Sequence, residues 1–163
     1  MQTIEEQVFE LLKKQNITLS TAESATGGMI ASMLVNVPGI SEFFQEGYVT
    51  YSNDAKIKMI GVDRNVIDTY GVVSRETAEN MAVSVAKTAG TDASLSVTGV
   101  AGPDGGTKDC PVGTVYIGCY YLGKVVTEHH IFSGTRMDVR ISAAKRALEL
   151  LIKCINTRKD EIL

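Results

Sequence analysis

The sequence is poor in the residues that bind zinc or build a disulfide framework. Its three cysteines, Cys110, Cys119 and Cys154, are odd in number and widely spaced. Its only histidines, His129 and His130, are adjacent, and we expect them to be structural. No Cys-x-x-Cys pair or Cys/His spacing typical of zinc sites is present. We therefore expect no metal, free thiols in the reducing cytoplasm, and an inert thiol at Cys110.

An excess of positive charge and long apolar runs are missing as well. The 163 residues include 16 Lys and Arg against 19 Asp and Glu, for a formal net charge of −3. Nucleic-acid binding requires a basic surface, so we expect no nucleic-acid partner. No apolar run approaches the ~20 residues of a membrane span, and the acidic N-terminus does not resemble a signal peptide. Length and composition instead fit one globular domain over residues 1–163.

Apolar periodicity and turn residues divide the chain into helices mixed with strands. A short Leu-Gly turn joins the last two strands, which predicts an antiparallel hairpin. This order is typical of an α/β protein in which helices cover both faces of a mixed sheet. The charged tail over 157–163 is expected to fray. Helices are predicted over 3–15, from 24 or 26 to 37, and over 55–60, 63–70, 74–90 and 135–156, and strands over 17–21, 44–51, 93–98, 114–121 and 124–132.

A first candidate site lies in the segment Thr-Ala-Glu-Ser-Ala-Thr-Gly-Gly, residues 21–28, between a β-prone run and an apolar helical run. Such a turn can present the Ser24 hydroxyl as a nucleophile while N–H groups of the next helix face an anion. Acyl transfer needs both within reach of one atom. Alternatively, Ser24 only caps the helix, because serine is a preferred N-cap. Taken alone, the segment favours the cap.

A second candidate is Lys56, which follows the strand-end residue Tyr51 and falls in the first turn of a helix. The helix dipole and any burial disfavour a charged ammonium there. A neutral lysine is a competent base for a serine. The alternatives are a solvated surface lysine, as expected for Lys58, and a Tyr51 ring that packs on the core.

Two further segments could bind an anion. The loop over 99–113 holds five glycines and follows a strand, so its N–H groups could face a phosphate. It matches neither the P-loop nor the dinucleotide fingerprint, and a plain surface loop is an equal alternative. Arg136 and Arg140 begin the last helix, where a bound anion would relieve the unfavourable dipole. Surface pairing with Asp138 is the alternative.

Four segments in this order resemble the CinA C-terminal-domain family. They are Thr-Ala-Glu-Ser-x-Thr-Gly-Gly, Tyr-Ser-Asn-x-x-Lys, Val-Thr-Gly-x-Ala-Gly-Pro-x-Gly-Gly-Thr and Pro-Val-Gly-Thr-Val. The resemblance covers about residues 3–155 and implies a three-layer α/β/α sandwich. It is closest to the stand-alone form, without the N-terminal domain of larger CinA proteins.

The resemblance also implies an activity. Members of the family are nicotinamide-nucleotide amidohydrolases, or NMN deamidases, which convert nicotinamide mononucleotide to nicotinate mononucleotide and ammonia in pyridine nucleotide recycling. By motif position, Ser24 would be the nucleophile, assisted by Tyr51 and Lys56. The scheme requires no metal or organic cofactor, and the family suggests a homodimer.

The implied reaction needs donors for an oxyanion and for the ribose phosphate of the substrate. We expect the helix start near Gly27 to hold the oxyanion and the glycine-rich loop to hold the phosphate, although the two roles could be exchanged. The predicted binding residues are Thr26, Gly27, Gly28, Thr98, Gly99, Ala101, Gly102 and Arg140, with Arg136 a weaker candidate.

Three positions depart from the family pattern. Ala25 stands where cysteine or another apolar residue is frequent, Asp104 where glycine is common, and Cys110 where a lysine is expected. The last two could alter loop shape or substrate affinity, and none of the three removes a catalytic group.

Two other functions remain alternatives. One is a serine amidase with the same chemistry on another amide, and the other is a non-catalytic module that binds a nucleotide as a sensor. The joint presence of Ser24, Tyr51 and Lys56 favours an enzyme, because a pure binder needs no such set.

Overall fold

The computed structural model describes residues 1–162, and only the backbone of residues 159–162. None of the described helices is both long and apolar enough to cross a membrane. The helices are α1 (Ile4–Gln15), α2 (Met29–Leu34), α3 (Asn53–Ile60), α4 (Arg64–Tyr70), α5 (Arg75–Ala89) and α6 (Arg136–Ile162), with a 3-10 helix, η1 (Ile40–Glu42). The strands are β1 (Leu19–Glu23), β2 (Phe44–Val49), β3 (Ala93–Gly99), β4 (Thr114–Tyr121) and β5 (Lys124–Ile131).

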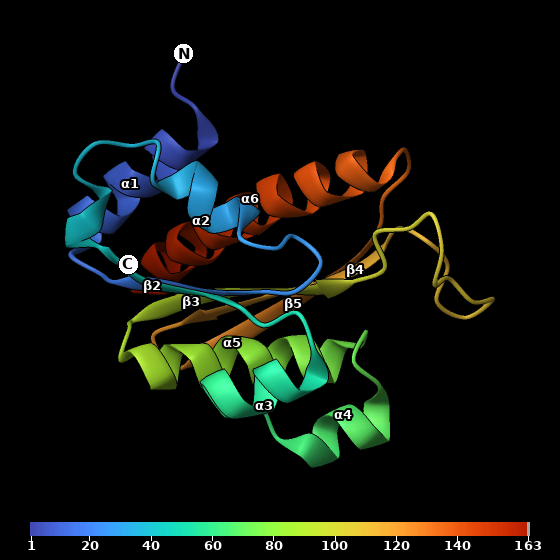
Figure 1. The fold of residues 1–163 in the computed structure, drawn as a ribbon. Coiled ribbons are helices and arrows are strands. Elements are labelled where there is room, and N and C mark those ends of the chain that lie inside the picture. Colours follow the sequence, from blue (N-terminus) through green and yellow to red (C-terminus); the bar gives the residue numbers. More distant parts are fainter. Residues whose placement is uncertain (163) are drawn as a thin grey trace.

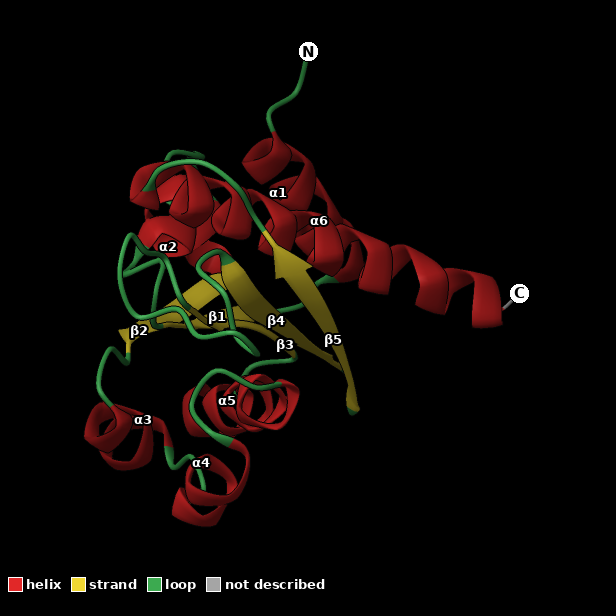
Figure 2. Cartoon of the chain, turned by 90° about the vertical axis from the view of Figure 1, so that its right-hand side faces the viewer, coloured by secondary structure: helices red, strands yellow, loops and turns green. Residues whose placement is uncertain are grey.

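The strands form one mixed sheet in the order β2-β1-β3-β4-β5. β1 pairs in parallel with β2 and β3, whereas β4 is antiparallel to both β3 and β5. Helices α1, α2 and α6 cover one face of the sheet, and α3, α4 and α5 cover the other (Figures 1 and 2). The predicted α/β/α sandwich with a mixed sheet is therefore confirmed, including the hairpin of β4 and β5.

The central strands β1 and β3 are buried on both faces, as expected for strands between two helical layers. Most of their polar side chains are hydrogen-bonded to neighbouring elements, and the buried hydroxyl of Thr21 is an exception. Ser94 and Ser96 of β3 donate hydrogen bonds to the carbonyls of Ala82 and Ala78 in α5, both at 2.6 Å. These buried serines attach α5 directly to the middle of the sheet.

Gly118 lets α5 approach β4 closely, and this contact makes a testable prediction. A Cβ atom at Gly118 would lie 2.5 Å from Ser96 Oγ and 2.7 Å from the Ala78 carbonyl oxygen. Gly118→Ala is therefore expected to lower the free energy of unfolding by about 1–3 kcal/mol, because backbone must move to admit the methyl group. Urea unfolding measures the change, and an unaltered midpoint and slope would show that α5 shifts at no cost.

The strand predicted over 17–21 lies two residues later, and α3 begins two residues before the predicted 55. Two other helix boundaries differ by more. The helix expected to start at residue 24 or 26 and to reach 37 is only α2, because residues 24–28 form turns in which Gly27 and Gly28 adopt positive φ angles of 57° and 95°. The tail that was expected to fray after 156 continues α6 to Ile162. No glycine or proline interrupts that segment. Arg158 also holds it against the β4–β5 turn by donating to the carbonyl of Leu122 at 2.7 Å.

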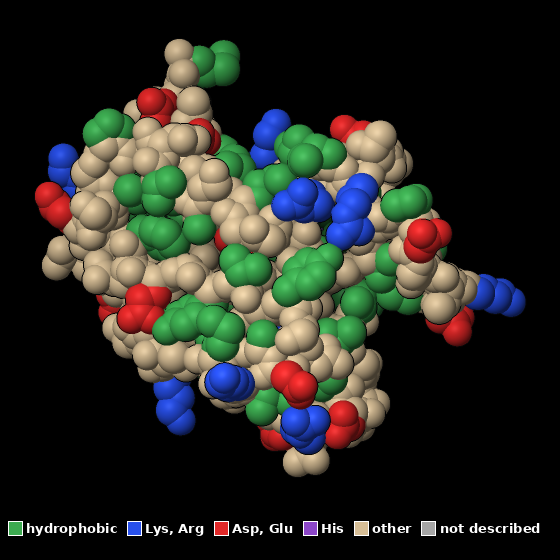
Figure 3. Space-filling view, in the orientation of Figure 1, with side chains coloured by type: hydrophobic (Ala, Val, Ile, Leu, Met, Phe, Trp, Pro, Cys, Tyr) green, Lys and Arg blue, Asp and Glu red, His purple; other side chains and the backbone are tan. Residues whose placement is uncertain are grey.

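The surface carries charges of both signs. The face shown in Figure 3 carries Lys and Arg side chains as well as Asp and Glu side chains, interspersed with apolar ones. This mixture is consistent with the balanced composition.

Candidate active site

The sheet topology brings the predicted segments together at one edge. The carboxyl ends of β1, β2 and β3 meet there. β2 lies on one side of β1 and β3 on the other, so the connections after β1 and β2 run in opposite directions across the sheet. Such a point is where α/β sheets bind ligands. The Ser24 N–H donates to the carbonyl of Val97 in β3, and the Thr50 N–H donates to the carbonyl of Glu23, both at 3.0 Å. Ser24 is thus fixed between its two neighbouring strands.

Lys56 reaches Ser24 from the first turn of α3. This helix is capped by Ser52, whose hydroxyl accepts the Ala55 N–H at 3.0 Å. The Lys56 side chain is 0% exposed, and its Nζ lies 3.1 Å from Ser24 Oγ. The contact joins two residues that are 32 positions apart in the sequence.

The surroundings of Lys56 favour its neutral form. Burial lowers the pKa of Lys56 from 10.5 to about 8. The amine also lies 2.8 Å from the Thr50 carbonyl and 3.4 Å from the Tyr51 carbonyl. A neutral amine can donate its two hydrogens to these carbonyls, which leaves its lone pair for the Ser24 hydroxyl. The geometry therefore suits a general base.

Tyr51 contributes its main chain, rather than its hydroxyl, to this cluster. Its side chain is 60% exposed, and its hydroxyl accepts a hydrogen bond from Arg136 at 2.9 Å. The Tyr51 carbonyl is the group that faces Ser24 Oγ, at 3.5 Å, and Lys56. A role of the Tyr51 hydroxyl in proton transfer stays a prediction.

The two arginines of α6 have different positions. Arg136 lines the pocket beside Ser24 and donates to the Gly102 carbonyl at 2.7 Å. Arg140 instead donates to the carbonyls of Ala25 and Thr26, at 3.1 and 3.0 Å. Arg140 therefore holds the turn after β1 in place, and Arg136, ranked second in the sequence, is the arginine of the pocket.

None of the residues predicted as oxyanion donors lines this pocket. Ala25 lines the pocket with Ser24, whereas Thr26, Gly27 and Gly28 lie outside the lining. The Gly27 N–H already donates to the Ser24 carbonyl at 3.0 Å. Within the described residues the Ala25 N–H has no hydrogen-bond partner, so it is the donor next to the nucleophile that an oxyanion could use.

The pocket has a volume of about 290 Å³, and the glycine-rich loop forms part of its wall. Thr98 donates its hydroxyl to the Val72 carbonyl at 2.8 Å, which ties the loop before α5 to the pocket. Gly99 is required by packing, because a Cβ there would lie 2.6 Å from the Thr114 carbonyl oxygen. The lining consists of Ser24, Ala25, Tyr51, Asn53, Lys56, Val72, Val73, Thr98, Gly99, Val100, Ala101, Gly102, Asp104, Gly105 and Arg136.

Glu23 supports the site and was not singled out from the sequence. Its side chain is buried, and its two carboxylate oxygens accept the N–H groups of Ile30 at 2.8 Å and Ala31 at 3.1 Å. The start of α2 is therefore already occupied by an internal anion. Its place immediately before Ser24, at the end of a β-prone run, is the signal that could have indicated a buried acid.

Replacing Glu23 tests this role. Glu23→Gln would turn an NH2 group toward one of the two N–H donors, so the free energy of unfolding is expected to fall by about 1–3 kcal/mol. The exposed Glu10→Gln in α1 is the control and should leave stability unchanged. Chemical unfolding of both variants measures this, and equal stabilities would contradict the assignment.

The comparisons with known proteins agree with the motif resemblance. The model of the CinA C-terminal domain family matches residues 1–155. The chain belongs to this family. A competence-damage inducible protein of Clostridium beijerinckii is 54% identical over 91% of the chain, and a CinA-like protein of Kosmotoga olearia is 47% identical over 94%. The matched regions are 36% and 37% of those relatives, so the chain spans about a third of their length.

Solved structures of family members share the fold. The competence/damage inducible protein CihA of Agrobacterium tumefaciens superposes with a TM-score of 0.89 and 35% identity, covering 94% of this chain and 93% of that one. A CinA superfamily protein of Escherichia coli superposes with a TM-score of 0.88 and 34% identity, covering 93% of this chain and 90% of that one. The family names describe competence and damage, and they specify no reaction.

Proposed function

We propose that this CinA-family chain is a serine amidohydrolase that converts nicotinamide mononucleotide to nicotinate mononucleotide and ammonia. The observation that carries the proposal is the buried amine of Lys56, 3.1 Å from the hydroxyl of Ser24, at the edge of an open pocket. If Ser24 served only as a helix cap, it would need no buried amine beside its hydroxyl. The choice of substrate comes from the motif resemblance.

The reaction would begin with proton transfer from Ser24 to the neutral Lys56 amine. Ser24 Oγ attacks the carboxamide carbon, and the oxyanion accepts the Ala25 N–H. The Lys56 ammonium, held by the Thr50 and Tyr51 carbonyls, then protonates the departing nitrogen, which leaves as ammonia. Lys56, neutral again, activates a water that hydrolyses the acyl-enzyme.

The substrate's phosphate would bind near Arg136 and the glycine-rich loop. Arg136 uses part of its guanidinium on Gly102 and Tyr51, and its remaining N–H groups can face an anion. Within the described part of the chain, the N–H groups of Ala101 and Gly102 form no hydrogen bond. These donors favour a nucleotide substrate, whose phosphate they could bind, over an amide that carries no charge.

The test is ammonia release from nicotinamide mononucleotide, nicotinamide riboside, nicotinamide and a simple aliphatic amide. We expect kcat/KM to be highest for the mononucleotide and about 10²-fold or more lower for the riboside, which lacks the phosphate. Equal rates on the riboside would refute the phosphate subsite and favour a general serine amidase. Tight binding of the mononucleotide without turnover would favour a sensor. Light scattering of the same sample tests the predicted homodimer.

A further inference from the structure

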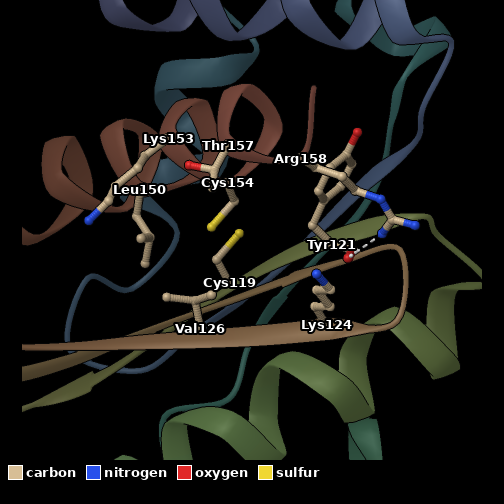
Figure 4. A pocket seen from close by; sticks show the side chains of 9 residues that line it. All are labelled: Cys119, Tyr121, Lys124, Val126, Leu150, Lys153, Cys154, Thr157 and Arg158. Carbon is tan, nitrogen blue, oxygen red and sulfur yellow. Dashed lines mark hydrogen bonds between the residues drawn. The ribbon is translucent and has the colours of Figure 1, made fainter. Parts of the chain in front are cut away.

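A second pocket, remote from Ser24, lies between α6 and the β4–β5 hairpin. It has a volume of about 190 Å³ and shares no lining residue with the candidate active site. Figure 4 shows the side chains of Cys119 on β4 and Cys154 on α6 pointing toward each other, with their sulfur atoms adjacent. Both cysteines are free thiols.

The two thiols have unequal access to solvent. Cys119 is completely buried, whereas Cys154 is partly exposed in the pocket. Hydrogen bonding between them, together with burial, raises the pKa of Cys119. The same hydrogen bond, with a smaller contribution from the Lys153 charge, lowers the pKa of Cys154. The accessible thiol is thus also the one that ionises more readily, and thiolates are the reactive form of cysteine.

We propose that Cys154 is a site of reversible thiol modification, and that Cys119 resolves the modification into a disulfide between α6 and β4. A buried sulfur facing an accessible one is the arrangement that this two-step chemistry needs. This proposal is independent of the amidohydrolase function.

The co-reactant is a low-molecular-weight disulfide, R–S–S–R. The Cys154 thiolate attacks one of its sulfurs, which forms a mixed disulfide on Cys154 and releases one RS⁻. The Cys119 thiol then loses its proton and attacks the Cys154 sulfur, which breaks the mixed disulfide and releases the second RS⁻. The two protein thiols lose two electrons and two protons, and the small disulfide is reduced to two thiols.

The charges at the pocket indicate which small disulfides react best. Lys124, Lys153 and Arg158 line it around an apolar floor that includes Val126 and Leu150 (Figure 4). Glu128 offsets part of this charge, since its carboxylate lies 3.6 Å from the Lys153 amine. Lys153 and Arg158 still favour an anionic disulfide over a cationic one.

The experiment uses the full chain with Cys110→Ser as background, because Cys110 is a partly exposed thiol outside this pocket. The protein is incubated with glutathione disulfide, which is anionic, and analysed by intact mass. We expect the mass to fall by that of two hydrogens and to recover with a reductant. Adding Cys119→Ser should trap the mixed disulfide on Cys154, whereas adding Cys154→Ser should leave the protein unmodified. Because the disulfide closes a loop of about 35 residues, the oxidised protein should also unfold at a higher temperature than the reduced one.

Two outcomes would overturn the proposal: persistent mixed disulfide with no internal bond when Cys119 is present, or equal modification of the Cys154→Ser protein. Peptide mapping of the unaltered oxidised chain gives the same answer if a variant does not fold. Cystamine, a cationic disulfide, is the probe for charge. Each rate is divided by the rate of the same disulfide with the urea-unfolded chain. We expect the resulting ratio to be about tenfold lower for cystamine than for glutathione disulfide. A higher ratio for cystamine would contradict the role of Lys153 and Arg158.

Discussion

Ser24→Ala is expected to lower kcat for ammonia release by about 10³–10⁶-fold, the range seen when a catalytic serine is removed. Its hydroxyl is the group that the buried Lys56 amine contacts, and no other hydroxyl is hydrogen-bonded to that amine among the described residues. The alanine keeps the main chain in place, so KM for nicotinamide mononucleotide should change little. Steady-state kinetics with direct ammonia detection measures both constants.

The matched control is Ser41→Ala, at an exposed serine in η1. It should retain native kcat and KM, and both variants should unfold at the native temperature. Turnover that survives Ser24→Ala would refute the nucleophile assignment, whatever the substrate.

Lys56→Met is expected to lower kcat by about 10²–10⁴-fold, because methionine keeps the side-chain length but cannot accept the Ser24 proton. Lys58→Met is the control, since Lys58 is on the same helix but exposed. Native activity in Lys56→Met would assign the base elsewhere, with the Tyr51 hydroxyl the next candidate.

The pH dependence follows from the lowered pKa of Lys56, which is about 8. Because the neutral amine is the active form, kcat/KM should increase about tenfold per pH unit below 8 and level off above it. A rate that levels off only near pH 10.5, the ordinary pKa of lysine, would show that the amine is not perturbed.

The same shift predicts how stability changes with pH. Because the folded-state pKa of Lys56 lies below its unfolded value, the folded chain releases this proton first. The native chain should therefore gain unfolding free energy relative to Lys56→Met as pH rises from about 8 to 10.5. Urea unfolding at several pH values tests this, and parallel curves for the two proteins would contradict the assigned cause.

Much of the fold could be predicted from local sequence. Alternating apolar and turn residues located the strands and most helices, because period and turn chemistry act over neighbouring positions. One failure has a local cause, and the other accompanies a long-range contact. Positive φ angles at Gly27 and Gly28 delay α2, and a contact of Arg158 with the β4–β5 turn accompanies the longer α6. Neither feature leaves a periodic signal.

The sequence by itself determined the family, the helix and strand order, and the pairing of a serine motif with a lysine motif. Only the tertiary structure decided which arginine enters the pocket, that Glu23 occupies the start of α2, and that the Tyr51 hydroxyl turns to Arg136. It also set the pKa of Lys56, since desolvation depends on the elements that pack around the amine. The motif resemblance implied which side chains meet, whereas their direction and burial depend on contacts between residues far apart in the chain.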